Sequence, residues 1–288
     1  MTIKDIAKIS GGSVSTVSRV LNNHPDVSED VRRKVMAVVE KYNYIPNNSA
    51  RALGQSKTDN IGLIVRGISN PFYTSIIHEI EQDIEKAGYT LVMQQIGSCD
   101  DELLAGAMME RDKRLRGLIF LGGRLDSTKE QIAGIGVPFV NCSSNNAYGT
   151  LDADSYSSVS IDDTQTAYEA VKELYKEGHR RIAVLLARPD DGSVSQIRYE
   201  GYVKALTEAG MAPDEDLIIS VDSYNIADAY YGTKEWLEKG IAFDAIFAIA
   251  DNLAMGAMRA LREKGIDVPK QCSIVAIDGI EVSEYMAP

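Results

Sequence analysis

The first 22 residues hold two short amphipathic segments joined by a Gly-Gly pair, which is the outline of a helix-turn-helix. Thr2 and Asp5 stand three residues apart, so the Thr2 hydroxyl is expected to cap the first helix while Asp5 complements its positive end. Apolar residues then recur at three- and four-residue spacing until Gly11 and Gly12 end the helix. The pattern predicts a small helical hairpin with one buried face.

The second helix of this hairpin is expected to begin after Ser13, which supplies its cap. Four apolar side chains are predicted to face inward, namely Val14, Val17, Val20 and Leu21. The outer face then carries small polar groups and one basic residue, namely Ser15, Thr16, Ser18, Arg19 and Asn22. Such a face fits a major groove, where hydroxyls contact phosphates or base edges and arginine bonds guanine through two hydrogen bonds. A hairpin without any DNA function would show the same capping and periodicity, so these residues alone leave both interpretations open.

A third helix is predicted over residues 28–42, with Ser28 as its cap and acidic residues in its first turn. Its apolar stripe is made by Val31, Val35, Val38 and Tyr42. Pro46 and the two asparagines after it break the pattern, and residues 49–53 are enough for only about one and a half turns of helix. Because so short a helix is not stable alone, the segment predicts a solvated linker in the free protein.

From Ile61 onward, apolar strand-like runs alternate with helical stretches. The predicted strands cover residues 61–65, 90–94, 117–121, 139–141, 182–186, 217–221, 245–249 and 273–277. This alternation predicts an α/β fold of doubly wound parallel sheets with helices on both faces. A break at 150–162, rich in Ser and Asp, divides the region into lobes of about 60–160 and 161–288. Ligands of such lobes bind beyond the carboxyl ends of the strands, which here means the cleft between the lobes.

Positive charge is concentrated at the start of the chain. Residues 1–60 hold 9 Lys and Arg against 6 Asp and Glu, a net charge of +3, whereas the other 228 residues hold 21 against 36, a net charge of −15. Charges farther away than a Debye length of about 8 Å are screened at physiological salt, so the acidic remainder leaves the basic head able to attract phosphates. The local charge agrees with DNA binding, although the net charge of −12 for the whole chain would argue against it.

Seven stretches together carry the signature of one protein family. They are TIKDIAKISGGSVSTVSRVLN at 2–22, DVSEDVRRKVMAVVEKYNYIPN at 26–47, NSARALGQSKTDNIGLIV at 48–65, SNPFY at 69–73, EGHRRIAVL at 177–185, DNLAMGAMRAL at 251–261 and SIVAIDGIEVSEYMAP at 273–288. Through them the sequence resembles the lactose-repressor (LacI/GalR) family of bacterial transcription regulators over essentially its whole length.

The resemblance implies a helix-turn-helix headpiece over residues 1–46, a hinge helix and linker over 47–59, and a periplasmic-binding-protein-like domain over 60–288 that binds an effector and dimerises. It further implies a cytoplasmic repressor that binds a palindromic operator in double-stranded DNA as a homodimer. A small polar effector, a sugar or a sugar derivative, would modulate that binding. Induction is the expected sign of the response, although corepression also occurs in the family.

In the family, the hinge helices form in pairs on DNA, and a leucine wedges into the minor groove. The matching leucine here is Leu53, and Ala50 would let the two helices approach closely. With Val14 and Ser15 expected to influence which sequence is preferred, the full set of predicted DNA-binding residues is Thr2, Ser13, Val14, Ser15, Thr16, Ser18, Arg19, Asn22, Ser28, Tyr44, Asn47, Ala50 and Leu53.

The effector site is predicted from residues that follow the strands. By resemblance, Arg198 and Asp278 hold the hydroxyls or the ring of the ligand, and aromatic side chains stack on its apolar face. The full predicted set is Phe72, Tyr73, Ser193, Ser195, Arg198, Tyr224, Asp251 and Asp278. Asp251 also has a structural interpretation, which we favour, as the cap of the helix over 251–261. The ligands of known members do not carry over directly, because Ser143 and Ala250 replace polar residues that are common in the family.

Other classes of protein fit less well. A sugar-binding transport protein would need a signal peptide and would have no use for the headpiece. An enzyme on a Rossmann-like sheet would show a phosphate loop, a GxGxxG turn or a GxSxG elbow, and none of these is present. No apolar run is long enough to span a membrane, and three scattered cysteines with three scattered histidines predict neither a metal site nor a cofactor. Family members usually continue beyond the position of Pro288, so we expect either a truncated sequence or a second lobe without its closing elements.

Overall fold

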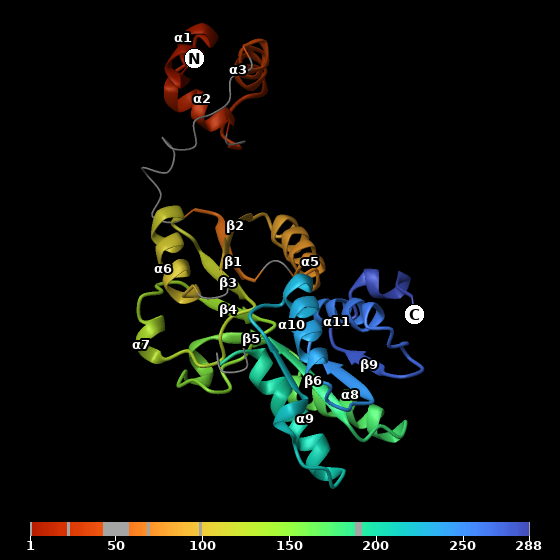
Figure 1. Cartoon of the computed structure of the whole chain (residues 1–288). Coiled ribbons are helices and arrows are strands. Elements are labelled where there is room, and N and C mark those ends of the chain that lie inside the picture. Colours follow the sequence, from red (N-terminus) through yellow and green to blue (C-terminus); the bar gives the residue numbers. More distant parts are fainter. Residues whose placement is uncertain are drawn as a thin grey trace. The chain divides into compact units, whose positions relative to one another are not determined.

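The computed structural model describes residues 2–21, 24–42, 58–67, 70–97, 100–187 and 192–287 (Figure 1). The chain divides into two compact units, Met1–Ser56 and Lys57–Pro288. Each unit has hydrophobic clusters of its own. Across the described ranges, no helix is both long enough and apolar enough to cross a membrane.

The smaller unit is a three-helix headpiece. Its helices are α1 Ile3–Ser10, α2 Val14–Leu21 and α3 Glu29–Lys41. At the start of α1, the Asp5 carboxylate accepts hydrogen bonds from the Thr2 backbone N–H at 2.8 Å and from the Thr2 hydroxyl at 2.9 Å. Gly11 ends the helix with a φ of 73°, a left-handed conformation that suits glycine. The core that joins the helices consists of Ile6, Ala7, Val17, Val20 and Val35.

Two side chains of the headpiece do not face inward as predicted. Val14 is 41% exposed, because it is the first residue of α2 and lies at the end of the helix rather than against α1 and α3. Tyr42 is 43% exposed, because α3 ends at Lys41 and its last turn extends beyond the small core. A core of three short helices covers only their central turns, so periodicity at helix ends overstates burial.

The first lobe of the larger unit is built on a five-stranded parallel sheet in the order β2-β1-β3-β4-β5. Its strands are β1 Asn60–Arg66, β2 Thr90–Ile96, β3 Gly117–Leu121, β4 Phe139–Cys142 and β5 Ser157–Val159. Its helices are α5 Phe72–Lys86, α6 Glu102–Lys113 and α7 Lys129–Ile132, and a 3₁₀ helix, η1, covers Ala153–Ser155. Alternate residues of β1 serve opposite faces, since Leu63 packs in the cluster with α5 and Ile64 in the cluster with α6.

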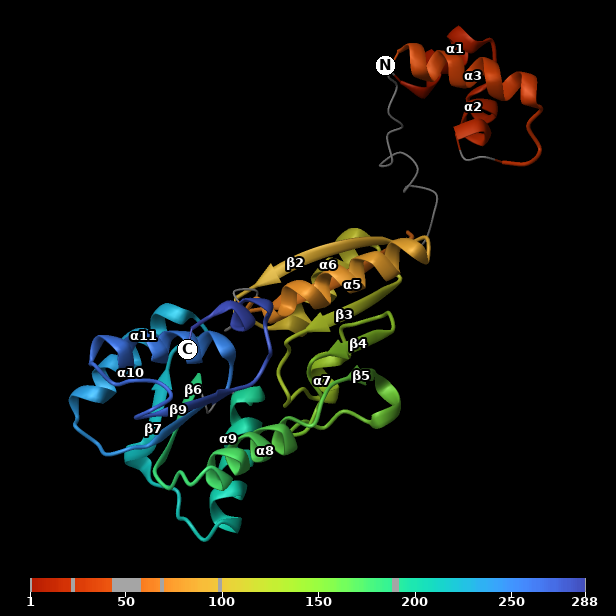
Figure 2. The same cartoon turned by 90° about the vertical axis from the view of Figure 1, so that its right-hand side faces the viewer.

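The second lobe repeats this winding in a four-stranded parallel sheet, β7-β6-β8-β9. Its strands are β6 Ile182–Ala187, β7 Ile218–Val221, β8 Ala245–Ala248 and β9 Ser273–Ala276. Its helices are α8 Asp163–Lys176, α9 Val194–Glu208, α10 Ile226–Glu238 and α11 Asp251–Glu263, with 3₁₀ helices η2 Glu215–Leu217 and η3 Glu281–Tyr285. Figures 1 and 2 show α8 beside α9 and α10 beside α11 on opposite faces of the sheet. Every residue of β6 is buried, because this central strand is covered on both sides.

The structure corrects one prediction for the segment between the lobes. The segment 150–162, interpreted as a break, contains β5, which pairs with β4 through Val140↔Ser157 and Cys142↔Val159. All three residues of β5 are exposed, so this short edge strand has no hydrophobic pattern that the sequence could reveal. It therefore completes the first sheet just before the chain enters the second lobe.

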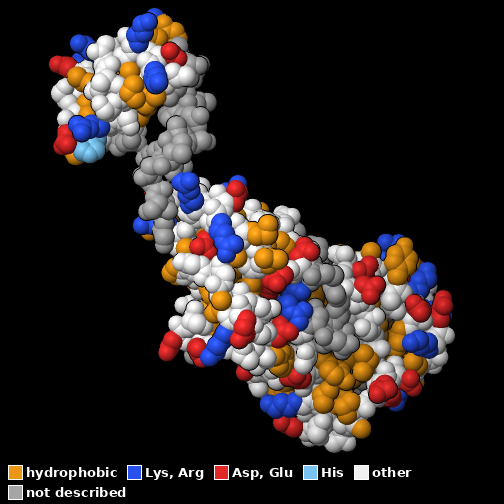
Figure 3. Space-filling view, turned by 90° about the vertical axis from the view of Figure 1, so that its left-hand side faces the viewer, with side chains coloured by type: hydrophobic (Ala, Val, Ile, Leu, Met, Phe, Trp, Pro, Cys, Tyr) orange, Lys and Arg blue, Asp and Glu red, His pale blue; other side chains and the backbone are white. Residues whose placement is uncertain are grey.

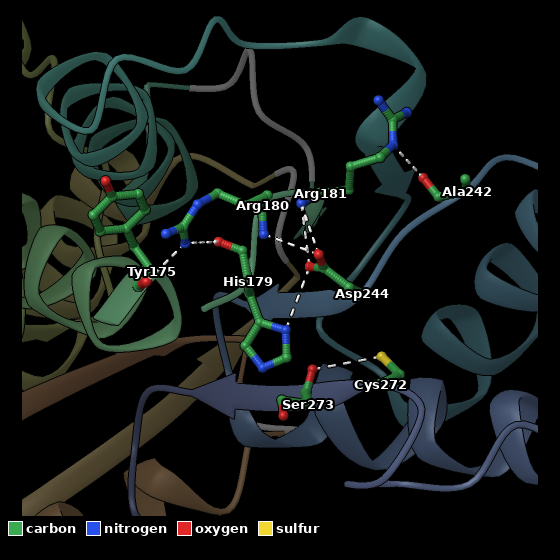
Figure 4. Close-up of polar contacts among 8 residues, drawn as sticks. All are labelled: Tyr175, His179, Arg180, Arg181, Ala242, Asp244, Cys272 and Ser273. Carbon is green, nitrogen blue, oxygen red and sulfur yellow. Dashed lines mark hydrogen bonds and ion pairs between the residues drawn. The ribbon is translucent and has the colours of Figure 1, made fainter. Parts of the chain in front are cut away.

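A polar cluster fixes the amino ends of the second sheet (Figure 4). The Asp244 carboxylate, just before β8, accepts hydrogen bonds from the backbone N–H of Arg180 at 2.9 Å and of Arg181 at 3.1 Å. It also lies 3.4 Å from Nδ1 of His179, while the Arg181 Nε donates to the carbonyl of Ala242 at 2.7 Å. The stretch EGHRRIAVL thus anchors β6 to β8 at the amino ends of both strands. This contact helps to hold the second sheet in register.

Candidate functional site

The exposed surface of α2 gathers most of the described residues predicted to bind DNA. Ser13, Val14, Ser15 and Arg19 are exposed, and Thr16 and Ser18 are partly exposed. The Ser13 hydroxyl lies 2.7 Å from that of Ser15 and 2.8 Å from that of Thr16, and it accepts from the Thr16 backbone N–H at 3.1 Å. Ser13 therefore caps α2, as predicted. The first turn of α2 presents hydroxyls beside an exposed valine methyl surface, a combination able to contact phosphate oxygens and a thymine methyl group.

The remaining predicted DNA-binding residues are divided. Thr2 and Ser28 are exposed and directly precede α1 and α3. Asn22, Tyr44, Asn47, Ala50 and Leu53 lie outside the described residues. Figure 3 shows Lys and Arg side chains spread over the visible face of the headpiece, and on the larger unit the two signs of charge alternate.

The larger unit contains a cavity of about 320 Å³ at the carboxyl ends of both sheets. The first lobe lines it with Arg66, Gly67, Asn70, Phe72, Tyr73, Ile96, Gly97, Gly122, Gly123 and Ser143, and the second with Ser193, Val194, Arg198, Ser223, Tyr224, Asn225 and Asp278. Each group comes from the carboxyl ends of the strands and from the loops and helices that follow them, where doubly wound sheets bind ligands. Six of the eight predicted effector residues lie here: Phe72, Tyr73, Ser193, Arg198, Tyr224 and Asp278.

Arg198 contacts two carboxylates and a backbone carbonyl at the cavity. Its Nε donates to Oδ1 of Asp163 at 2.8 Å, and its Nη1 donates to the carbonyl of Ile249 and lies 3.6 Å from Oδ1 of Asp278. Burial opposes the charge, but the carboxylates of Asp163 and Asp278 outweigh it and raise the pKa of Arg198 above its ordinary value. The guanidinium thus stays charged and fixed in orientation, which prepares it to hold a ligand oxygen.

Asp278 joins the two lobes across the cavity. Its Oδ2 accepts from the Asn70 side-chain amide at 3.1 Å, and the Asn70 Oδ1 accepts from the backbone N–H of Phe72 at the start of α5. Asp278 adopts a φ of 132°, which is rare for a residue other than glycine and marks a strained position. Burial raises the pKa of the Asp278 carboxyl, with Arg198 acting against that shift. A ligand hydroxyl that donates to this carboxylate would stabilise its charged form.

Aromatic side chains enclose the first-lobe side of the cavity. The rings of Phe72 and Tyr73 pack at 5.7 Å between centroids. Burial raises the pKa of Tyr73 to about 12, and the negative charge of Asp278 acts in the same direction. Gly122 is required beneath this ring, since a Cβ there would lie 2.5 Å from the Tyr73 hydroxyl and the residue adopts a φ of +76°.

Sequence reasoning missed several charged and polar residues of the cavity. Arg66, at the end of β1, lines it, and its Nε lies 4.0 Å from Oε2 of Glu102 in the first turn of α6. A charged residue that closes an apolar strand was the available signal for Arg66. Glu102 and Asp163 gave no such signal, because acidic residues in a first helical turn are explained by the helix dipole alone.

Two predicted effector residues, Ser195 and Asp251, do not line the cavity. Ser195 is fully buried inside the first turn of α9, two residues beyond the capping Ser193. Asp251 is buried and accepts from the backbone N–H of Ile280 at 2.8 Å, so it fixes the turn that follows β9. The preferred interpretation of Asp251 as a helix cap is also wrong, because α11 begins at Asp251 and its N-cap is Ala250.

The comparisons with known families cover nearly all of the chain. Residues 2–47 match the family described as bacterial regulatory proteins, lacI family, and residues 58–284 match periplasmic binding proteins and sugar binding domain of LacI family. The regulator MalR of Clostridium butyricum is 43% identical over 292 residues, which span 100% of this chain and 86% of that protein. The ribose operon repressor of Haemophilus influenzae is 31% identical, over 100% of this chain and 84% of that protein.

Solved structures agree in fold. The lac repressor dimer bound to operator and the anti-inducer ONPF matches with a TM-score of 0.80 and 26% identity, covering 99% of this chain and 84% of that chain. The regulator CelR in complex with cellobiose matches with a TM-score of 0.69 and 27% identity, covering 99% of this chain and 85% of that chain. With its headpiece and its two-lobed parallel-sheet core both matched, this chain belongs to the LacI family of bacterial regulatory proteins.

Proposed function

We propose that this protein is a transcriptional repressor in the cytoplasm that binds a palindromic operator as a homodimer and releases it when a small sugar-like effector binds. In this proposal α2 lies in the major groove, with Arg19 bonded to a base and Ser13, Ser15 and Thr16 contacting the backbone or base edges. Two-fold symmetry of a dimer requires a palindrome, and the hinge residues Ala50 and Leu53 would contact its centre. The lac repressor relative, solved as a dimer on its operator, supports this assembly.

The observation that carries the proposal is a ligand-sized cavity, lined from both lobes, in the same chain as a helix-turn-helix headpiece. Its volume of about 320 Å³ suits a small molecule. The side chains of Arg198 and Asn70 supply donors, the Asp278 carboxylate supplies an acceptor, and Phe72, Tyr73 and Tyr224 supply flat apolar surfaces. Alternating hydroxyls and an apolar ring face are the features of a sugar that match this lining.

The effector is proposed to act by linkage. A ligand that bonds both Asp278 and first-lobe residues replaces or reinforces the Asn70–Asp278 bridge, and it thereby favours one orientation of the lobes. The hinge segment lies immediately before β1 in the sequence, so lobe orientation is expected to set the spacing of paired hinges. The effector changes operator affinity only through its different affinities for the two orientations.

A gel-shift assay with fragments of genomic DNA tests this function. We expect the full chain to retain specific fragments. Adding a pool of cytoplasmic saccharides should then release these fragments. Retention that is equal for all fragments, or that no small molecule alters, would contradict the proposal. The relatives MalR and the ribose operon repressor are named as regulators of transcription. If this protein were instead an enzyme, it would convert the bound ligand into a product.

A further inference from the structure

Two buried arginines line the effector cavity, one from each lobe, and each has a carboxylate behind it. Arg198 of the second lobe is paired with Asp163 at 2.8 Å, their side chains being 8% and 9% exposed. Arg66 of the first lobe is paired with Glu102 at 4.0 Å, their side chains being 8% and 5% exposed. Asp163 begins α8 and Glu102 begins α6, so each carboxylate is fixed by a helix while its arginine reaches the cavity.

Asp278 adds a third carboxylate without adding a third cation. Its Oδ1 lies 3.6 Å from Nη1 of Arg198, the guanidinium that is also paired with Asp163. Its Oδ2 accepts a hydrogen bond from the neutral side-chain amide of Asn70. Among the residues that the structure describes, Asp278 is the only acidic side chain that lines the cavity. Among the described residues, these two guanidinium groups therefore stand within 4.0 Å of three carboxylates, so each arginine of the cavity already has a counter-ion.

Two groups of the cavity have their pKa shifted against the negatively charged form, chiefly by burial. Burial raises the pKa of Asp278 even though Arg198 acts in the opposite direction. Burial also raises the pKa of Tyr73 to about 12, and the charge of Asp278 contributes to that shift. Burial thus makes a charge costly in this cavity, and an anion that enters it needs a cation that has no counter-ion of its own.

We propose that this cavity selects uncharged saccharides and rejects their phosphate esters, with Arg66, paired with Glu102, as the first-lobe donor to the sugar. The inference rests on the proposed sugar-responsive function. A phosphate ester carries a charge of about −1.5 to −2 at pH 7 and needs a desolvated cation that is not already neutralised. A sugar hydroxyl needs no such cation, because it donates to Asp278 and accepts from Arg66 or Arg198.

Calorimetric titration of the full chain tests the selection. The probes are glucose, maltose, cellobiose and ribose, together with glucose 1-phosphate, glucose 6-phosphate, ribose 5-phosphate and inorganic phosphate. We expect at least one uncharged sugar to bind, its ester to bind at least about tenfold more weakly, and inorganic phosphate to bind no more tightly than the esters. An ester that binds as tightly as its parent sugar would overturn the inference while leaving a sugar-responsive regulator intact. Absence of binding in both series would instead contradict the proposed function, and this inference with it.

Two variants test the charge argument directly. Glu102→Gln keeps the shape but removes one carboxylate, so the preference for the uncharged sugar over its ester should fall several-fold. Arg66→Gln should weaken binding of the uncharged sugar about tenfold or more. The matched control is Glu110→Gln on the same helix, because Glu110 bonds the backbone N–H of Gly136 away from the cavity and should leave the preference unchanged. The proposed role of Arg66 and Glu102 would be refuted if Glu102→Gln kept the preference of the parent protein and Arg66→Gln kept its affinity for the sugar. If a variant fails to fold, the titration of the wild-type protein still tests the selection.

Discussion

The surface of α2 and the effector cavity differ in how many segments of chain build them. The candidate DNA-binding face is formed within nine consecutive residues, from Ser13 to Leu21, whose spacing alone sets which side chains are exposed. The cavity draws on side chains from Arg66 to Asp278, carried by loops that follow strands of two sheets. A site made within one helix tolerates changes without affecting the rest of the fold, whereas a site made by many segments also holds those segments together.

The largest effect is expected for Arg198→Ala in the cavity. The substitution leaves Asp163 and Asp278 buried without their shared cation, and breaking a buried pair typically costs about 3–5 kcal/mol. Chemical denaturation should show that loss in the free energy of unfolding, and gel shifts should show operator binding that no effector reverses. Arg262→Ala, at an exposed position of α11, is the control and should change neither quantity. Parental stability for Arg198→Ala would mean that the pairing of Arg198 with Asp163 and Asp278 does not stabilise the second lobe.

A smaller loss of stability is expected for Gly122→Ala. Its φ of +76° disfavours a side chain by about 1–2 kcal/mol, and the new Cβ would meet the Tyr73 hydroxyl at 2.5 Å, which adds about 1–3 kcal/mol of overpacking. Gly178→Ala is a matched control, with a φ of +100° and no atom within 4 Å of the built Cβ. Urea denaturation of both variants separates the two contributions. Equal losses would show that the packing beneath Tyr73 is not tight.

The local site should respond differently. Arg19→Ala is expected to lower operator affinity by about 1–3 kcal/mol and to relax the preference at one base position in each half-site. Because Arg19 is exposed on α2, the free energy of unfolding should stay within about 0.5 kcal/mol of the parent value. Selection of binding sites from random DNA, with denaturation measured in parallel, checks both statements. An unchanged base preference would reduce Arg19 to a phosphate contact.

The smallest effect concerns pH. The pKa of Asp278 is raised in the folded protein, so the folded state binds a proton more readily than the unfolded state does. Relative to Asp278→Asn, the parent protein should therefore gain stability as the pH falls through the raised pKa toward the ordinary value of 3.8, and it should lose that gain as the pH rises. Denaturation curves for the two proteins between pH 4 and pH 7 measure the difference. A difference that stays constant across this range would show that Asp278 titrates normally.

The contrast between the two sites also explains which predictions the structure bears out. Helix caps and apolar periodicity act over three or four residues, so Ser13 was placed correctly and the apolar strands were found near their actual positions. Val14 was misplaced, since burial at a helix end depends on how far the neighbouring helices extend. The strand β5 was missed, because an exposed edge strand is held by pairing with β4 and leaves no pattern of its own.

By itself, the sequence determined the alternation of helices and strands apart from β5, the family and the edge of each sheet at which a ligand would bind. Only the tertiary structure decided which polar side chains reach the cavity. Ser193 lines it and Ser195 does not, because α9 begins between them and turns the second serine into the interior. Arg66 and Arg198 carry the same charge, and each is paired with a carboxylate from the first turn of a helix, Glu102 of α6 or Asp163 of α8. Short-range periodicity is encoded along the chain, whereas the meeting of distant charges depends on how two sheets are packed.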